Sequence, residues 1–157
     1  MSLTTSGDDE AVPGFYDTGP PDAQGFIPFR FPAGRFNANF PFRARLEGEG
    51  RVLVRIETGL HAANAGGRLH GGYTLAAVEQ ALPVTLFMLP DRSFTPAVVL
   101  TFAIQFVTGG DIEQPIDVFV SVVRETKRLF FLSGTAEQGD AVLMNWQATA
   151  SKVTPRK

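Results

Sequence analysis

The sequence predicts an α+β fold in which an antiparallel β-sheet curls around one long apolar helix. Residues 73–89 contain a single charged side chain, Glu79, and form too long an apolar run for a strand, so they predict a buried helix. A strand hairpin precedes this helix and a series of alternating segments follows it. One sheet packed around the helix buries the apolar faces of all these elements together, which makes it the most economical arrangement.

The hairpin before the helix is predicted from two segments on either side of a glycine turn. Residues 40–47 and 51–58 flank residues 48–50, and the second segment alternates apolar and polar side chains as a half-buried strand does. A glycine-rich loop then leads to the helix. Pro83 lies well inside the helix, where the lost backbone hydrogen bond costs roughly 3 kcal/mol, so we expect a kink there.

Four more strands are predicted after the helix, which we expect to end at residues 89–91. Short, turn-like separators join the four segments, and a parallel crossover needs a dozen residues or more. We therefore expect each strand to pair antiparallel with its neighbour in the chain, as a meander. The four segments are residues 96–107, 115–124, 128–137 and 141–153.

The N-terminal residues 1–35 are predicted to form an irregular arm ahead of a single domain at residues 36–157. Repeated prolines and glycines disfavour a regular helix in this arm. Recurring aromatic residues argue against a solvated linker. We interpret the arm as a segment that packs its rings on the domain; the alternative, that some rings line a ligand pocket, stays open. The aromatic residues concerned are Phe15, Tyr16, Phe26, Phe29 and Phe31.

The composition argues against several classes of function. The 157 residues include 14 basic and 16 acidic side chains, a net charge of −2, without the basic stripe of a nucleic-acid-binding protein. The absence of cysteine excludes a thiolate nucleophile and sulfur-ligated zinc. His61 and His70 lack a clustered carboxylate, so neither a metal nor another cofactor is expected. Without a signal peptide or a long apolar span, we expect a cytoplasmic protein that does not contact membranes.

Candidate chemistry lies where the glycine-rich loop meets the helix. Gly71 and Gly72 leave backbone N–H groups open at the positive end of the helix dipole, where negative charge is stabilised. Alone, such a pair more often marks a tight turn. Glu79 strengthens the functional interpretation, because a buried carboxylate is costly unless something uses or satisfies it. It is a candidate general base whose pKa burial would raise; the alternative is a carboxylate that reaches solvent at a sheet edge.

The separation of these groups predicts a dimer. Glu79 follows Gly71 by eight residues, which places it about 12 Å further along the helix. One carbonyl group cannot easily contact both. Two helices lying antiparallel across a twofold axis would bring Glu79 of one subunit to Gly71 of the other. The low share of charged residues, 19%, is also consistent with a covered surface.

The spacing of Asn64, Gly67, the triplet at residues 70–72 and Glu79 resembles the signature of the hot-dog-fold acyl-CoA thioesterases, in particular the branch typified by the phenylacetate-pathway enzymes. In that signature an Asn is followed three residues later by Gly, then by His-Gly-Gly and an acidic residue on the central helix. The resemblance extends over about residues 36–153. It implies a hot-dog fold, hydrolysis of an acyl-CoA thioester to free acid and CoA without a cofactor, and a homodimer or homotetramer.

The resemblance also implies a role for each matching residue. Glu79 would be the base or the nucleophile at the thioester carbonyl, and the N–H of Gly71 would polarise the carbonyl oxygen. Asn64 would orient the attacking water or the substrate. His70 would support the start of the helix, and Gly72 would permit close approach. Many members of the branch carry Asp in place of Glu79, so direct attack and water activation both stay open.

Thr101 is the remaining candidate for substrate binding. Relatives place a Ser or Thr near the reacting carbonyl on the strand that follows the helix, and Thr101 is the hydroxyl residue in this region. Because the match there is weak, a non-catalytic acyl-CoA-binding module on the same fold is the alternative function. Four cations in or near loops are candidates for the phosphates of CoA: Arg92, Arg124, Lys127 and Arg128.

Overall fold

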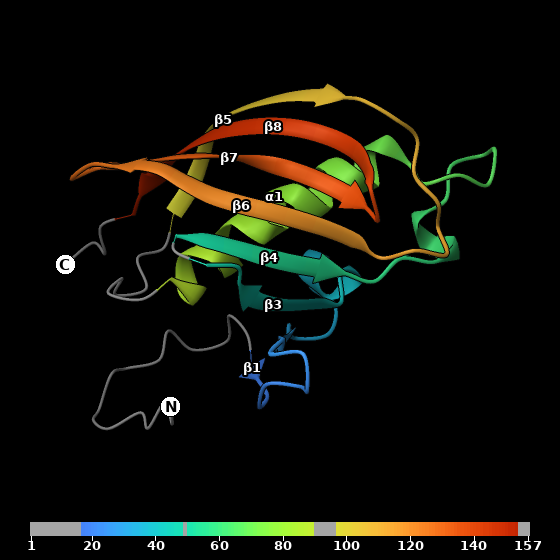
Figure 1. Cartoon of the computed structure of the whole chain (residues 1–157), viewed down its shortest axis with the longest axis horizontal. Helices are drawn as coiled ribbons and strands as arrows, with labels where there is room; N and C mark the ends of the chain where they lie inside the picture. The colour runs from blue at the N-terminus through green and yellow to red at the C-terminus, as the bar shows by residue number, and fades with distance from the viewer. Residues whose placement is uncertain (1–16, 49, 90–96, 154–157) are drawn as a thin grey trace.

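Helix α1, Gly71–Met88, lies in the curve of an eight-stranded antiparallel sheet (Figure 1). The computed structural model describes residues 17–48, 50–89 and 97–153. The predicted helix is confirmed and begins two residues earlier than expected, since both glycines belong to its first turn. It continues through Pro83, and Leu89 caps its C-terminus. No helix in the described ranges is long and apolar enough to cross a membrane.

The sheet has the strand order β1-β2-β3-β4-β6-β7-β8-β5, with antiparallel pairing throughout. Its six long strands agree closely with the predicted segments, because alternation of apolar and polar residues marks a strand buried on one face. They are β3 (Phe42–Leu46), β4 (Arg51–Ile56), β5 (Ala97–Phe106), β6 (Ile116–Glu125), β7 (Leu129–Gln138) and β8 (Ala141–Lys152).

The predicted meander is wrong for β5, which pairs with β8 at the far edge of the sheet instead of with β6. The connection at residues 107–115 crosses the ends of β8 and β7 to reach β6. Three strand spacings measure roughly 14 Å, whereas an extended segment of this length spans roughly 30 Å. The separator is therefore long enough for a crossover, although its glycines suggested a tight turn.

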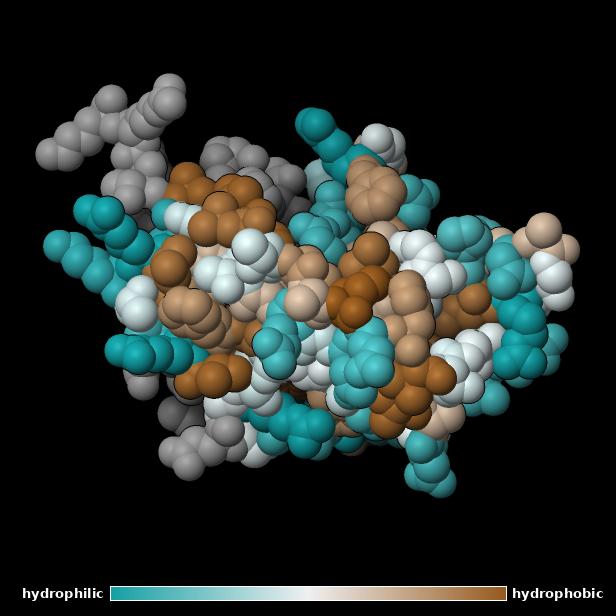
Figure 2. Space-filling view, turned by 90° about the horizontal axis from the view of Figure 1, so that it is seen from above, coloured by the Kyte–Doolittle hydropathy of each residue, from teal (hydrophilic) through white to brown (hydrophobic). Residues whose placement is uncertain are grey.

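Strand β5 leaves apolar side chains exposed along this edge. Val98 and Leu100 are 56% and 57% exposed, and Phe106 and Val107 near its end are 55% and 53% exposed. Figure 2 views the molecule from the β5 side and shows hydrophobic residues gathered there. An edge strand also has backbone N–H and C=O groups available for pairing.

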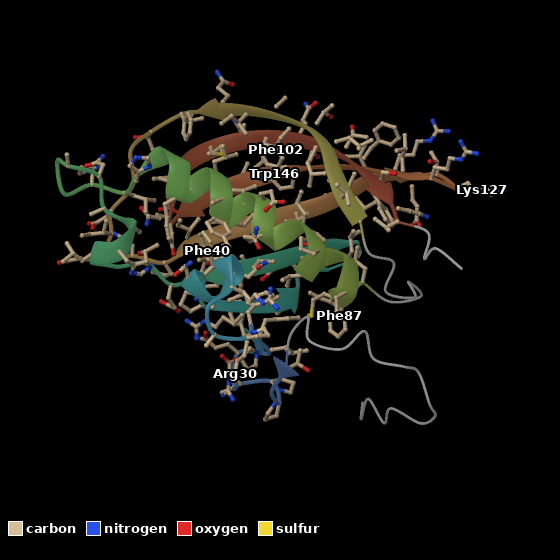
Figure 3. All side chains as sticks on the ribbon, turned by 180° about the vertical axis from the view of Figure 1, so that it is seen from behind. Arg30, Phe40, Phe87, Phe102, Lys127 and Trp146 are labelled. Atoms are coloured by element: carbon tan, nitrogen blue, oxygen red, sulfur yellow. The ribbon has the colours of Figure 1, made fainter. Side chains whose placement is uncertain are left out.

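The core lies between α1 and the inner face of the sheet. The buried helix residues, among them Val78 and Leu82, pack against the apolar residues of β3, β4 and β6. On the other side of the helix, the rings of Phe102 and Trp146 stack at 5.8 Å (Figure 3). Helix α1 is thus enclosed by strands from both halves of the sheet, which fixes the direction in which Glu79 and the helix N-terminus point.

The N-terminal arm is not wholly irregular, which corrects the expectation for residues 1–35. Two short strands, β1 (Asp17–Thr18) and β2 (Ile27–Arg30), extend the sheet beyond β3, and a 3-10 helix, η1 (Phe36–Asn39), follows them. Pro28 can take part because β2 lies near the edge of the sheet. The expected packing of aromatic rings occurs at Phe29, which is 3% exposed. The domain boundary at residue 36 stays a prediction.

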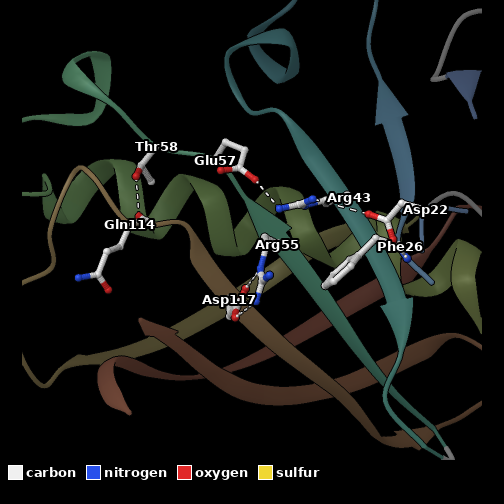
Figure 4. Close-up of polar contacts among 8 residues, drawn as sticks. All are labelled: Asp22, Phe26, Arg43, Arg55, Glu57, Thr58, Gln114 and Asp117. Atoms are coloured by element: carbon white, nitrogen blue, oxygen red, sulfur yellow. Dashed lines mark hydrogen bonds and ion pairs between the residues drawn. The ribbon is translucent and has the colours of Figure 1, made fainter. Parts of the chain in front are cut away.

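A cluster of arginines fixes the arm to the outer face of the β3–β4 hairpin (Figure 4). The guanidinium groups of Arg43, Arg45 and Arg55 lie 4.5–5.3 Å from the ring centroid of the buried Phe26. Arg55 also donates two hydrogen bonds of 2.6 Å to Asp117. These side chains alternate with the buried residues of their strands, so the charges lie on the face of the sheet opposite α1.

Gly134 on β7 is expected to be intolerant of a side chain. A Cβ atom there would lie 1.8 Å from the Phe119 carbonyl oxygen and 2.7 Å from Cζ2 of Trp146. Gly134→Ala should therefore lower the free energy of unfolding by about 1–3 kcal/mol through overpacking, measured by urea titration. Gly109→Ala is the matched control, because its Cβ would make an ordinary contact at 3.6 Å. Equal urea midpoints for the two variants would contradict this account.

Candidate active site

The loop before α1 is shaped by Asn64. Its Oδ1 accepts hydrogen bonds from the backbone N–H groups of Gly66 at 2.9 Å and Arg68 at 3.1 Å. Gly67 takes a positive φ of 76°, which favours glycine at this turn. The Asn64 side-chain oxygen is thus occupied by the loop, and its amide nitrogen is the atom left to contact a ligand.

His70 caps the N-terminus of α1. Its Nδ1 accepts a hydrogen bond of 2.9 Å from the Gly72 N–H, and its carbonyl accepts one of 3.1 Å from the Thr74 N–H. A Cβ at Gly72 would lie 3.0 Å from the His70 ring. Gly72 therefore makes room for the cap, and the resulting geometry satisfies one of the otherwise unpaired donors of the first turn.

The N–H of Gly71 is a donor of this turn that the cap leaves open. Among the described residues it has no hydrogen-bond partner. Gly71 lines a cavity of about 350 Å³ together with Thr74, Phe106 and Gly110. An N–H group at the positive end of an 18-residue helix and at the wall of a cavity is well placed to stabilise an oxyanion.

Glu79 lies two turns further along α1 and is half-buried. Burial raises the pKa of its carboxyl group, and a hydrogen bond from Gln80 partly offsets this rise. Pro83, four residues later, cannot donate the helical hydrogen bond to the Glu79 carbonyl oxygen. A carboxylate with a raised pKa in an apolar helix has the character of a general base.

The structure does not bring all the predicted site residues together within one chain. His70, Gly71 and Gly72 form one unit at the helix start, with the Asn64 loop beside them. Glu79 is about 12 Å away along the helix axis and does not line the cavity at Gly71.

Thr101 lies apart from both groups. It is paired with Thr149 and lines a second cavity of about 490 Å³ on the outer face of the sheet, away from α1. A role for Thr101 in substrate binding stays a prediction.

Two polar residues that the sequence motif did not include are linked to Glu79 by hydrogen bonds, Gln80 directly and Asn37 through Gln80. Gln80 donates a hydrogen bond from Nε2 to Oε2 of Glu79, and its Oε1 accepts one from Nδ2 of Asn37 on η1. Gln80 could have been noticed as the other long polar side chain in an otherwise apolar run. Asn37 gave no such signal, because 43 residues separate it from Gln80.

The charged residues considered for CoA phosphates lie elsewhere. Arg124, Lys127 and Arg128 are exposed around the β6–β7 turn, with Lys127 at its tip (Figure 3). Arg92 lies outside the described residues. Within the described ranges, no group of three or more His, Asp or Glu side chains is arranged to hold a metal ion.

The fold is that of a hot-dog protein: one long helix enclosed by a strongly curved antiparallel sheet. The family of acyl-CoA thioesterase N-terminal domains matches residues 60–151, which include the loop, α1 and the four strands that follow. This match covers more than half of the chain, so the chain belongs to that acyl-CoA thioesterase family. The narrower resemblance to the phenylacetate-pathway branch stays a prediction. No curated protein matches the chain in sequence.

Solved structures agree on the fold. Zebrafish thioesterase superfamily member 2 has a TM-score of 0.65 at 17% identity, covering 77% of this chain and 88% of that chain. A hypothetical thioesterase from Streptococcus pneumoniae, solved with coenzyme A, has a TM-score of 0.61 at 16% identity, covering 73% and 88%. A Streptococcus mutans protein bound to acetyl-CoA has a TM-score of 0.64 at 19% identity, covering 80% and 97%.

The raised pKa of Glu79 predicts that Glu79→Gln stabilises the fold at neutral pH. Ionising this carboxyl group costs more in the folded than in the unfolded state, so folding stability falls as pH rises from the ordinary carboxyl range through the raised pKa. Glutamine stays neutral and avoids this loss. Urea midpoints should be higher for the variant at about pH 7.5 and equal to those of the wild type at about pH 4. A less stable variant at neutral pH would contradict the assignment of a costly carboxylate.

Proposed function

We propose that this protein hydrolyses an acyl-CoA-type thioester to a free acid and CoA. The observation that carries the proposal is the pairing, on the central helix of a thioesterase-family domain, of an open Gly71 N–H at a cavity wall with a half-buried Glu79. The coenzyme A and acetyl-CoA bound to two of the structural neighbours support this substrate class.

In the proposed reaction, Glu79 removes a proton from a water molecule as the water attacks the thioester carbonyl carbon. The carbonyl oxygen becomes an oxyanion, which the Gly71 N–H stabilises. The C–S bond then breaks, the acyl group leaves as the acid, and the proton held by Glu79 passes to the CoA thiolate. In the alternative course Glu79 attacks the carbonyl directly, and water hydrolyses the resulting anhydride. Both courses yield one acid and one thiol from one water.

The remaining motif residues would act through the helix start. His70 and Gly72 hold the first turn, in which the Gly71 N–H has no partner among the described residues. The amide nitrogen of Asn64 is the atom that could orient the water or the substrate, since its oxygen serves the loop.

We propose that the working unit is a homodimer, alone or as half of a tetramer. The 12 Å between Gly71 and Glu79 is too long for one carbonyl group to contact both, so a complete site needs Glu79 of one subunit beside Gly71 of another. The exposed apolar residues and open backbone of edge strand β5 support an interface at that edge.

A non-catalytic acyl-CoA-binding module is the second candidate. Thr101 lies on the outer face of the sheet and the Asn64 oxygen is engaged by the loop, so the site draws on fewer side-chain groups than the family signature implies. A protein with this binding function would have the same fold and cavity but would not hydrolyse the thioester.

Glu79→Gln is expected to reduce thioester hydrolysis roughly 100- to 10,000-fold, the usual contribution of a positioned base. Release of free thiol should be measured over a panel of aliphatic and aromatic acyl-CoA substrates, beside Glu57→Gln as a control at an exposed carboxylate on the loop after β4. Wild-type rates in Glu79→Gln would exclude Glu79 as the base. Tight binding of acyl-CoA by the wild type without turnover on any substrate would favour the binding module.

Light scattering is expected to give at least a dimer at about 10 µM protein. Leu100→Asp on edge strand β5 should shift the protein toward monomer and reduce turnover with it, because each half-site would lose its complement. Leu46→Asp on β3, which is 47% exposed, is the matched control and should leave the mass unchanged. An active wild-type monomer would contradict a site shared between subunits.

A further inference from the structure

Gln80 links Glu79 to η1, the short 3-10 helix that follows the N-terminal arm. Its amide nitrogen donates to the Glu79 carboxylate, and its amide oxygen accepts from the side chain of Asn37. The three side chains, all half-buried, form a chain of hydrogen bonds from η1 to the carboxylate of the helix. The carboxylate therefore contacts a side chain that another element of the fold holds in place.

Helix η1 is held firmly against α1 by aromatic packing. Phe40, at the end of η1, is 3% exposed, and its ring lies 4.9 Å from that of Tyr73 in the first turns of α1. The ring of Phe36 packs on Phe40 at 5.3 Å. Figure 3 shows Phe40 beside the helix. Asn37, between these two rings in sequence, is thereby fixed over Gln80.

The donor at Asn37 decides which way the Gln80 amide faces. An amide has a donor end and an acceptor end. With its oxygen accepting from Asn37, Gln80 must present its N–H to Glu79, where it stabilises the charged carboxylate. If the amide turned over, its oxygen would face the carboxylate and two acceptors would repel each other. The orientation of the Gln80 amide therefore depends on a residue of η1.

No charged side chain of the strands packed on α1 stabilises the Glu79 carboxylate in place of Gln80. The strands against α1 are β3, β4 and β6, and their charged residues, apart from Glu125 at the end of β6, lie on the outer face of the sheet. On the helix itself, the titratable neighbours are Tyr73, whose pKa burial raises to about 12, and the capping His70. Among the described residues of these strands, the charged groups facing away are Arg43, Arg45, Arg51, Arg55, Asp117 and Arg124, whereas Glu125 at the end of β6 pairs with Phe130 and is bound by Lys152.

We propose that Asn37 and Gln80 are positioning residues that orient the Glu79 carboxylate and favour its charged form, so that η1 is part of the active site. This inference rests on the proposed function, in which Glu79 acts on the thioester. It assigns η1 a role in reactivity in addition to its packing on α1.

The pH dependence of turnover tests the proposal. Asn37→Asp is nearly the same size but cannot donate to Gln80, and Gln80→Met removes the amide without adding charge. Each should lower kcat at about pH 6.5 by roughly tenfold, the worth of a hydrogen bond to a charged group. KM should change by less than about twofold, and the acidic limb of the pH profile should move to higher pH. Asn39→Asp, which places the same charge on the exposed side of η1, is the matched control.

A second measurement does not depend on turnover. The carboxyl carbon of Glu79 can be followed by NMR in protein labelled with ¹³C-glutamate and assigned by its absence in Glu79→Gln. Its titration should move to higher pH in Asn37→Asp and Gln80→Met and stay in place in Asn39→Asp. Circular dichroism checks that each variant is folded. If Asn37→Asp is not folded, the test relies on Gln80→Met.

The outcomes separate the two proposals. If Glu79→Gln keeps wild-type turnover, the proposed base is wrong, while the titration still tests the hydrogen-bond chain. If Glu79→Gln is inactive but both positioning variants titrate and turn over as the wild type does, the role of Asn37 and Gln80 is overturned. Loss of kcat without any movement of the pH profile or of the carboxyl titration would also overturn it, because a purely structural role predicts that result.

Discussion

The burial of helix α1 in the curve of the sheet is the constraint on which the rest of the structure depends. The helix is apolar on nearly all sides, so strands must enclose it, and β3, β4 and β6 do so on one side and the Phe102–Trp146 stack on the other. This enclosure gives the one carboxylate of the helix its raised pKa. The ionised form of Glu79 therefore lowers the stability of the fold, and such costs are common at functional sites.

The start and the middle of α1 differ in their chemical environment. At the start, His70 satisfies one backbone donor and leaves the next one, on Gly71, at the wall of a cavity. In the middle, Gln80 stabilises a charge that burial disfavours. The first arrangement leaves a backbone donor open at the positive end of the helix dipole, and the second favours the charged form of the carboxylate. Their separation along a rigid helix is the physical reason for expecting two subunits in one site.

Most of the fold and part of the site could be predicted from local patterns. The helix and the strands have periods of 3.6 and 2 residues, and these periods placed every long element to within a few residues. The exception was the pairing of β5, because alternation gives the two faces of a strand but not its neighbour. In the site, the glycine pair and Glu79 were conspicuous by residue type and position, whereas Asn37 was not.

The sequence by itself determined an apolar helix with one carboxylate, a glycine-rich start with a histidine cap, and a set of amphipathic strands, since each depends on residues close together in the chain. Only the tertiary structure decided that β5 closes the far edge beside β8 and that η1 reaches Glu79 through Gln80. Both are contacts between distant segments. They are set by how the sheet wraps around the helix, and local periodicity carries no information about that wrapping.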